Sequence, residues 1–256
     1  MSFSPGSPIL LPKGMIVFEE MSRFIRDTFV ANDYQQVRGP ILCHQSLWEQ
    51  SGHWEFYKDD MFLIEGEEGD QLGLKPMNCP VHMRLFGMKT RSYRELPYRL
   101  HDQSPLHRNE ASGALSGMTR LRMFCQDDTH IFVQPEEIQN EISKILRLVD
   151  HVYTSFGMDY KIKLSTKPDD ALGTQEEWDL AEGSLVEALE KNGKAYEIKD
   201  KDGAFYGPKI DFDVRDALGR EWQVATAQLD FQMPKRFALE YTDKDGAKKQ
   251  PVVIHN

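Results

Sequence analysis

The chain has 256 residues, 31 basic and 41 acidic side chains, and a formal net charge of −10 at pH 7. This excess of acidic side chains argues against non-specific binding along nucleic acids, because such binding needs basic side chains that neutralise many phosphates. It does not exclude a local basic cleft. The apolar runs are far shorter than the roughly 20 residues that cross a bilayer, and no basic region precedes the short apolar run at the N-terminus, as a signal peptide would require. Three cysteines make no disulfide framework, so we expect a cytoplasmic protein.

The first third of the chain mixes helix and strand patterns. Residues 14–34 carry apolar side chains at helical spacing and end in an Asn-Asp stop signal. The patterns that follow predict a strand over 35–43, a short helix over 44–52, a strand over 69–80 that runs into a turn, and a helix over 81–89.

The segment 92–133 alternates like two strands, 92–110 and 119–133, joined by a loop rich in glycine and serine. Side chains alternate between the faces of a strand, so Gln126, Asp128 and His130 are expected on one face. Arginines lie on both sides of the loop. They allow two interpretations: surface ion pairs, or forked cations that bind a phosphate or carboxylate.

The second half begins with the strongest helix pattern, over 135–157, with proline at its start and glycine at its end. A strand is expected over 160–166 and a helix over 174–193, where Thr174 and Glu177 form a capping-box pattern. Further strands are expected over 203–216, 221–231, 237–243 and 251–256. Helices and strands do not alternate as βαβ units, which predicts an α+β fold with an antiparallel sheet and helices packed against it.

A metal site is one of two open interpretations for Cys79, His130 and His255. Their spacing matches neither a CxxC nor an HExxH pattern, and buried structural roles suit each of them. His82 or His107 fits a metal site equally well on composition. The chain also lacks a GxxxxGK[ST] phosphate loop, so any nucleotide must depend on the arginines.

Several long motifs together resemble one family. These are "SGHWEFYKDDMF", "LKPMNCPVH", "HRNEASGALSGMTRLRMFCQDDTHIF", "GAFYGPKIDF", "WQVATAQLDF" and "VVIH". They are similar to the catalytic core of the threonyl-tRNA synthetases, which are class II aminoacyl-tRNA synthetases. The resemblance implies one catalytic core over residues 1–256, in which 1–13 form an N-terminal extension. Relative to the family, we expect the N-terminal editing region, motif 3 and the anticodon-binding domain to be missing.

The same resemblance implies roles for individual residues. In the ATP site, the catalytic Arg108 would contact the α-phosphate and Arg120 would contact the γ-phosphate. Glu110 would bind the adenine amino group, and Phe124 would stack on adenine. Mg²⁺ would accompany the ATP. Zn²⁺, one per chain, would be held by Cys79, His130 and His255. The threonine pocket would be lined by Met77, Gln126, Asp128, Tyr206, Lys209 and Gln228. The motif 1 region with Gly39 and Pro40 would form a homodimer interface.

The implied function is ATP-dependent conversion of L-threonine to threonyl-adenylate, followed by transfer to the acceptor end of tRNA(Thr), with no membrane partner. Two alternatives stay open. A shortened paralogue could load a non-tRNA acceptor such as a carrier protein, which the acidic balance and the expected lack of an anticodon domain favour. A non-catalytic regulatory homologue is the other alternative, which the expected lack of motif 3 favours.

Overall fold

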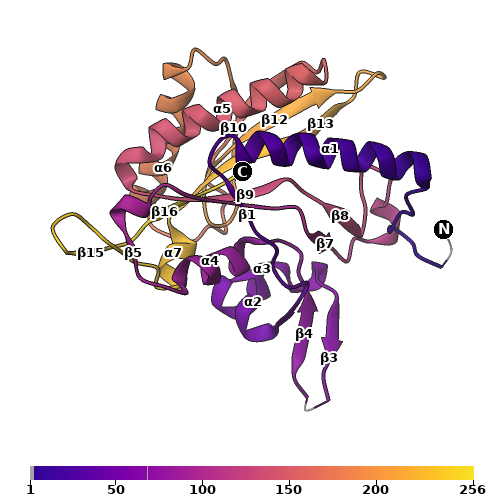
Figure 1. The fold of residues 1–256 in the computed structure, drawn as a ribbon, viewed down its shortest axis with the longest axis horizontal. Coiled ribbons are helices and arrows are strands. Elements are labelled where there is room, and N and C mark those ends of the chain that lie inside the picture. Colours follow the sequence, from indigo (N-terminus) through magenta and orange to yellow (C-terminus); the bar gives the residue numbers. More distant parts are fainter. Residues whose placement is uncertain (1–2, 68) are drawn as a thin grey trace. The chain divides into compact units, whose positions relative to one another are not determined.

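A computed structural model describes residues 3–67 and 69–256, so the first two residues of the expected N-terminal extension lie outside the described part (Figure 1). The chain forms two compact units. The first unit comprises residues 1–88 and 99–129, and the second comprises residues 89–98 and 130–256. Within the described residues, no helix is both long and apolar enough to span a membrane.

The first unit begins with the long helix α1 (Pro12–Val30), whose proline at the first turn is preorganised for helix. A three-stranded antiparallel sheet has the order β2-β4-β3. The remaining elements are short helices and two strand pairs, β1 with β6 and β7 with β8. Their bounds are β1 (Gln35–Gln36), β2 (Leu42–His44), α2 (Gln45–Ser51), α3 (His53–Tyr57), β3 (Leu63–Glu65), β4 (Gln71–Leu74), α4 (Cys79–Gly87), β6 (Tyr98–Asp102), β7 (Pro105–His107) and β8 (Met123–Cys125).

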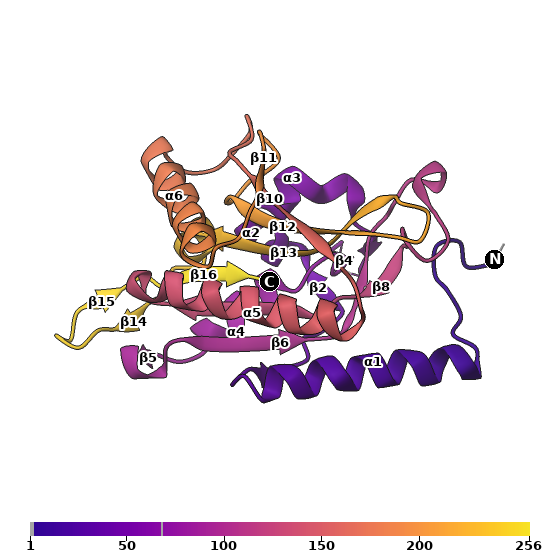
Figure 2. The same ribbon diagram turned by 90° about the horizontal axis from the view of Figure 1, so that it is seen from above.

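The second unit is built on six strands in the order β9-β16-β13-β12-β10-β11. Neighbouring strands are antiparallel except β10 and β11, which are parallel. The helices α5 and α6 pack on each other and both contact β13, as Figures 1 and 2 show. The bounds are β9 (Asp128–Val133), α5 (Ile138–Ser155), β10 (Tyr160–Ser165), α6 (Gln175–Lys191), β11 (Glu197–Lys199), β12 (Lys209–Arg215), β13 (Glu221–Asp230) and β16 (Val252–His255).

A small sheet of order β15-β14-β5 and the helix α7 complete the second unit. Their bounds are β5 (Arg91–Ser92), α7 (Gln232–Arg236), β14 (Tyr241–Thr242) and β15 (Lys248–Lys249). The predicted α+β class, with a large and mainly antiparallel sheet flanked by helices, is confirmed. The predicted strand over 237–243 is wrong for most of its length, because Ala238 has a positive φ and only Tyr241 and Thr242 pair with another strand.

The prediction of two long strands over 92–110 and 119–133 is also wrong, since each is broken into shorter pieces. Asp102 ends β6, because its Oδ1 accepts the backbone N–H of Ser104 at 2.7 Å, a local turn that competes with the ladder. Residues 126 and 127 separate β8 from β9. Asp128 and His130 therefore share a strand, whereas Gln126 precedes it, so strand alternation does not place Gln126 on their face.

The capping box predicted for residues 174–177 is present at the start of α6. The Thr174 side chain accepts the Glu177 N–H at 3.3 Å, and the Glu177 carboxylate accepts the Thr174 N–H at 3.2 Å. We expect Thr174→Ala to lower the free energy of unfolding by about 1 kcal/mol, because one helix-end donor loses its partner. Urea unfolding followed by circular dichroism measures this loss. Thr154→Ala, at an exposed position near the end of α5, should change it by less than about 0.5 kcal/mol, and equal effects of the two would contradict the capping role.

Candidate active site

Two buried histidines face each other across neighbouring strands of the second unit. The antiparallel pairing of β9 with β16 places His130 directly opposite His255. The two residues are 0% and 5% exposed, and their ring centroids lie 4.6 Å apart with the ring planes at 73°. Strand register therefore brings together two imidazoles that are far apart in the sequence.

Asp230, at the end of β13, fixes the orientation of His255. Its Oδ2 lies 2.8 Å from His255 Nε2, while its Oδ1 accepts the backbone N–H groups of Gln232 and Met233. The carboxylate is fully buried. A histidine held in this way at one ring nitrogen presents the other nitrogen to a ligand. Sequence reasoning missed Asp230, because only the strand register places it beside His255.

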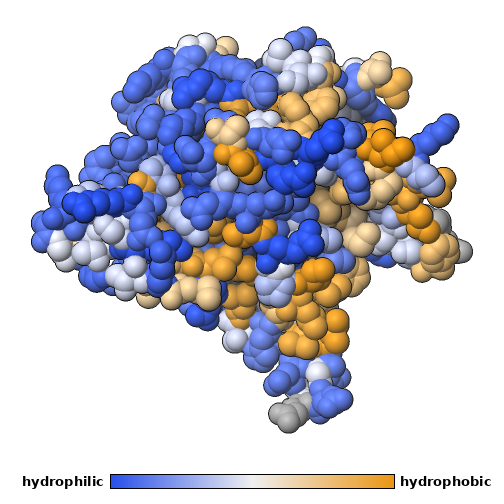
Figure 3. All heavy atoms as spheres, in the orientation of Figure 1, coloured by the Kyte–Doolittle hydropathy of each residue, from blue (hydrophilic) through white to orange (hydrophobic). Residues whose placement is uncertain are grey.

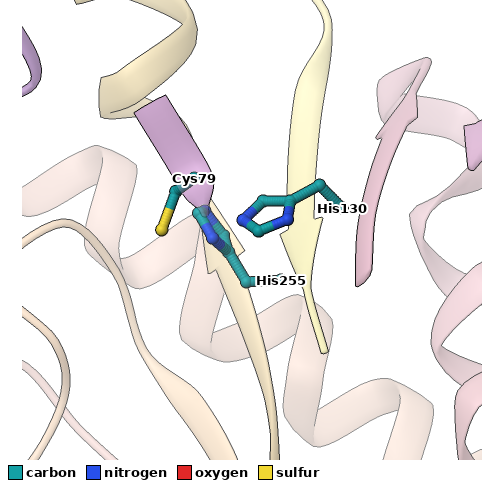
Figure 4. Close-up of side chains that lie close together, drawn as sticks. All are labelled: Cys79, His130 and His255. Atoms are coloured by element: carbon teal, nitrogen blue, oxygen red, sulfur yellow. The ribbon is translucent and has the colours of Figure 1, made fainter. Parts of the chain in front are cut away.

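Cys79 completes a possible metal-binding set. It is the first residue of α4 and is buried. Its sulfur and one nitrogen from each of His130 and His255 all lie within 4.8 Å of one another (Figure 4). One thiolate and two imidazoles suit a tetrahedral zinc ion with three protein ligands and an open position, at about 2.3 Å from sulfur and about 2.0–2.1 Å from nitrogen. The types of donor present therefore fit a zinc ion.

Two of the predicted pocket residues lie against His255 in the second unit. The Tyr206 ring centroid is 4.9 Å from that of His255, and its hydroxyl is hydrogen-bonded to Gln228 Oε1. Gln228 is also the strand partner of both His255 and Lys209. The Lys209 ammonium contacts Asp211 at 2.9 Å and Asp202 at 3.2 Å. Tyr206 and Gln228 thus border the histidine pair, whereas carboxylates engage Lys209.

Asp128 is the predicted pocket residue of the first unit with the best-defined surroundings. Its Oδ2 accepts a hydrogen bond from Asn78 Nδ2 at 2.9 Å. Met77, next to Asn78, is partly buried, while Gln126 is exposed between two strands. The Asn78 amide was not singled out in the sequence. It joins Asp128 to a group of buried polar side chains.

The β7–β8 hairpin positions Arg108 and Phe124 side by side in the first unit. The Arg108 N–H donates to the Arg122 carbonyl at 3.0 Å, which continues the hairpin, and Arg108 Nε donates to the Pro76 carbonyl at 3.2 Å. The Arg108 guanidinium carbon lies 5.1 Å from the Phe124 ring centroid, within cation–π range. The Arg108 charge is therefore fixed in place by the fold.

The other two predicted ATP residues pair with each other. Arg120 Nε lies 3.0 Å from Glu110 Oε2, and the Arg120 side chain is 59% exposed. Exposed pairs of this kind contribute roughly 0–1 kcal/mol, so separating Arg120 from Glu110 costs little. Arg122, which sequence reasoning did not select, donates from Nε to the Glu110 carbonyl at 2.9 Å and supports the loop.

Comparison with known proteins identifies the class. Residues 62–256 match the family described as tRNA synthetase class II core domain (G, H, P, S and T). The chain belongs to this family of class II synthetase cores.

Within this class, the chain is similar to threonine–tRNA ligases. It is 50% identical over 252 residues to threonine–tRNA ligase 2 of Bacillus subtilis (strain 168), which covers 98% of this chain and 39% of that protein. Threonine–tRNA ligase of Finegoldia magna is 46% identical over 251 residues, with the same coverage. The crystal structure of the RNA binding domain of threonyl-tRNA synthetase from Cryptosporidium parvum Iowa II superposes with a TM-score of 0.95 at 46% identity. It covers 98% of this chain and 63% of that one.

These matches confirm the resemblance that the sequence motifs indicated. The chain spans about 39% of the length of the curated relatives named here.

Proposed function

We propose that this chain is the catalytic core of a threonine–tRNA ligase, with residues 1–13 as an extension, and that it activates L-threonine with ATP and serves transfer to tRNA(Thr). The observation that carries the proposal is the grouping of Cys79, His130 and His255, with Tyr206 and Gln228 beside His255. The similarity to threonine–tRNA ligases supports it.

Selection of threonine needs more than a well-shaped apolar pocket. Threonine and valine have nearly the same shape, and an apolar pocket separates such pairs by only about 100-fold. A zinc ion held by Cys79, His130 and His255 would accept the amino and hydroxyl groups of threonine as further ligands. Asp128 would accept a hydrogen bond from the same substrate groups. Serine retains the hydroxyl, so we expect weaker discrimination against serine than against valine.

The proposed ATP side consists of Arg108, Glu110, Arg120 and Phe124, with Mg²⁺ on the phosphates. In adenylate formation, the threonine carboxylate attacks the α-phosphorus and pyrophosphate leaves. Both reactants are anionic, so catalysis depends on positioning and on cations that offset charge repulsion. Arg108 is suited to this role because the Pro76 carbonyl and the Phe124 ring hold its guanidinium in place.

Threonine-dependent exchange between ATP and pyrophosphate tests the proposal. We expect exchange with threonine, slower exchange with serine and almost none with valine. Absence of exchange at saturating substrate contradicts the proposal and favours a non-catalytic homologue. Exchange without charging of tRNA(Thr) supports the alternative in which a non-tRNA acceptor, such as a carrier protein, receives threonine.

The homodimer is part of the proposal, and α1 offers an apolar surface for it. Hydrophobic side chains gather at the right of Figure 3, over the N-terminal end of α1, where Leu11, Ile16 and Val17 are 70%, 64% and 58% exposed. Contiguous exposed apolar side chains are typical of association surfaces. The motif 1 segment follows the C-terminal end of α1 and includes Gly39, which is buried, and Pro40, which is exposed.

Sedimentation analysis of the double variant Ile16→Glu/Val17→Glu tests this interface. We expect the wild type to sediment as a dimer and the double variant as a folded monomer, because two carboxylates become desolvated in an apolar contact. Leu180→Glu, at a 62%-exposed position on α6, is the control and should remain dimeric. A dimeric double variant would contradict the use of α1.

We also propose a cytoplasmic location. Cys43, Cys79 and Cys125 are all free thiols in the structure, and a reducing compartment would keep Cys79 available as a metal ligand.

A further inference from the structure

A fully buried ammonium lies in the first unit, linked through one side chain to Asp128 of the proposed threonine pocket. Lys75 follows β4, and its side chain is 0% exposed. Its Nζ donates to Asn78 Oδ1 at 2.6 Å and to Ser104 Oγ at 2.7 Å, and lies 3.7 Å from Asp102 Oδ2. Burial lowers the pKa of Lys75 below its usual value, and Asp102 opposes that shift. A charge in such a position is costly unless its partners are well arranged.

The Asn78 side chain is bound on both sides, which fixes its orientation. An ammonium only donates hydrogen bonds and a carboxylate only accepts them. The Asn78 carbonyl oxygen must therefore face Lys75, and its NH₂ group must face Asp128, where the distance to Oδ2 is 2.9 Å. A flipped amide would place like partners together at both ends. Lys75 thus determines which group of Asn78 reaches Asp128.

The opposite end of this network is anchored on Asp102. Its Oδ1 accepts the Ser104 N–H at 2.7 Å, and its Oδ2 accepts the Gly39 N–H at 3.0 Å and lies 3.5 Å from His82 Nε2. Burial alone would raise the pKa of Asp102, but the nearby His82 and hydrogen bonds from Ser104 and Gly39 outweigh it and hold the pKa well below its usual range. Lys75 is thereby kept in one position between Asp102 and Asn78.

Lys75 has Asp102 as an ion-pair partner, and its hydrogen bond to Asn78 extends the network to Asp128. We propose that Lys75 is a positioning residue for threonine binding, which acts through Asn78 to hold the Asp128 carboxylate toward the substrate. The inference rests on the proposed function, since it presumes that Asp128 contacts threonine. Loss of Lys75 or Asn78 should therefore weaken the binding of threonine but not the binding of ATP.

Isothermal titration calorimetry of the full zinc-loaded chain, with threonine and with a non-hydrolysable ATP analogue, tests this inference. We expect Lys75→Met and Asn78→Leu each to weaken threonine binding about 10-fold and to leave analogue binding within about twofold. Because Lys75 acts through Asn78, the double variant should bind threonine no more weakly than Asn78→Leu alone. Lys194→Met is the control. It removes an ammonium from an ion pair with Asp150 in the second unit and should bind threonine normally.

The outcomes separate the two proposals. A wild-type chain that binds no threonine overturns the proposed function. A wild type that binds threonine, together with Lys75→Met that binds it equally well, overturns the inference alone. Additive losses in the double variant, or parallel losses for threonine and the ATP analogue, also overturn it. Circular dichroism shows whether Lys75→Met is folded. If it is unfolded, Asn78→Leu tests the same link, because this variant keeps Lys75 with its partners Ser104 and Asp102. Unchanged threonine binding by Asn78→Leu then overturns the inference.

Discussion

Replacement of Arg108 by alanine is expected to lower threonine-dependent exchange between ATP and pyrophosphate by about 10²- to 10³-fold. The structure holds the Arg108 guanidinium between the Pro76 carbonyl and the Phe124 ring, so its charge is already in place before substrates bind. Removal of one preorganised group that stabilises developing negative charge typically costs this much in rate. Bound zinc should be unchanged, because Arg108 is not a donor to the metal.

Two further variants show whether the Arg108 effect is specific. Arg108→Lys keeps the charge but loses the planar fork, so we expect activity between that of the wild type and that of Arg108→Ala. Arg94→Ala removes another arginine that lies over an aromatic ring, at 5.5 Å from the Tyr93 centroid in the second unit, and should retain nearly full exchange. An Arg108→Ala chain with near wild-type exchange would contradict the assigned role.

Loss of the zinc site is the second large expected effect. We expect about one equivalent of zinc per wild-type chain and almost none in Cys79→Ala or His130→Ala, because two remaining donors rarely retain the ion. Metal analysis by plasma mass spectrometry measures this directly. Cys43→Ala is a matched control, since Cys43 is a buried free thiol that packs in a hydrophobic cluster outside the donor set. Full zinc in both ligand variants would refute the site.

Asp230→Asn should weaken zinc binding without abolishing it, because Asp230 holds the ligand His255 and is not itself a ligand. The asparagine side chain still reaches His255 Nε2 but carries no charge, so zinc affinity should fall by about 10- to 100-fold while about one equivalent still binds at saturating zinc. A competitive titration with a zinc chelator measures this affinity. Affinity equal to that of the wild type would show that Asp230 does not influence the metal.

Local sequence patterns predicted the three long helices, whose apolar spacing and end signals lie within the helix itself. Apolar spacing and end signals located α1, α5 and α6, and the Thr174–Glu177 capping box is present as predicted. The same patterns failed where polar side chains interrupt a strand. Alternation alone extended the strand over residues 92–110, whereas the Asp102 side chain forms a turn with Ser104 that ends it.

The site depended on register and on long-range contacts, which local patterns do not contain. His130 and His255 come together only because β9 pairs with β16, and Asp230 reaches His255 only because β13 is the other neighbour of β16. Residue types alone left a metal site as one interpretation among several. The resemblance selected Cys79, His130 and His255, and these are the donors that lie close together in the structure. The link from Lys75 through Asn78 to Asp128 could not be predicted, since Asn78 and Asp128 are 50 residues apart.

Above all, we propose that this chain recognises threonine at the site that contains Cys79, His130 and His255. The most direct test is calorimetric titration of the zinc-loaded and zinc-stripped chain with threonine and with valine. We predict that threonine binds the zinc-loaded chain at least about 100-fold more tightly than valine does, since a site built for a hydroxyl rejects an analogue without one. We also predict that this preference disappears without zinc. Equal binding of the two amino acids to the zinc-loaded chain would contradict the account.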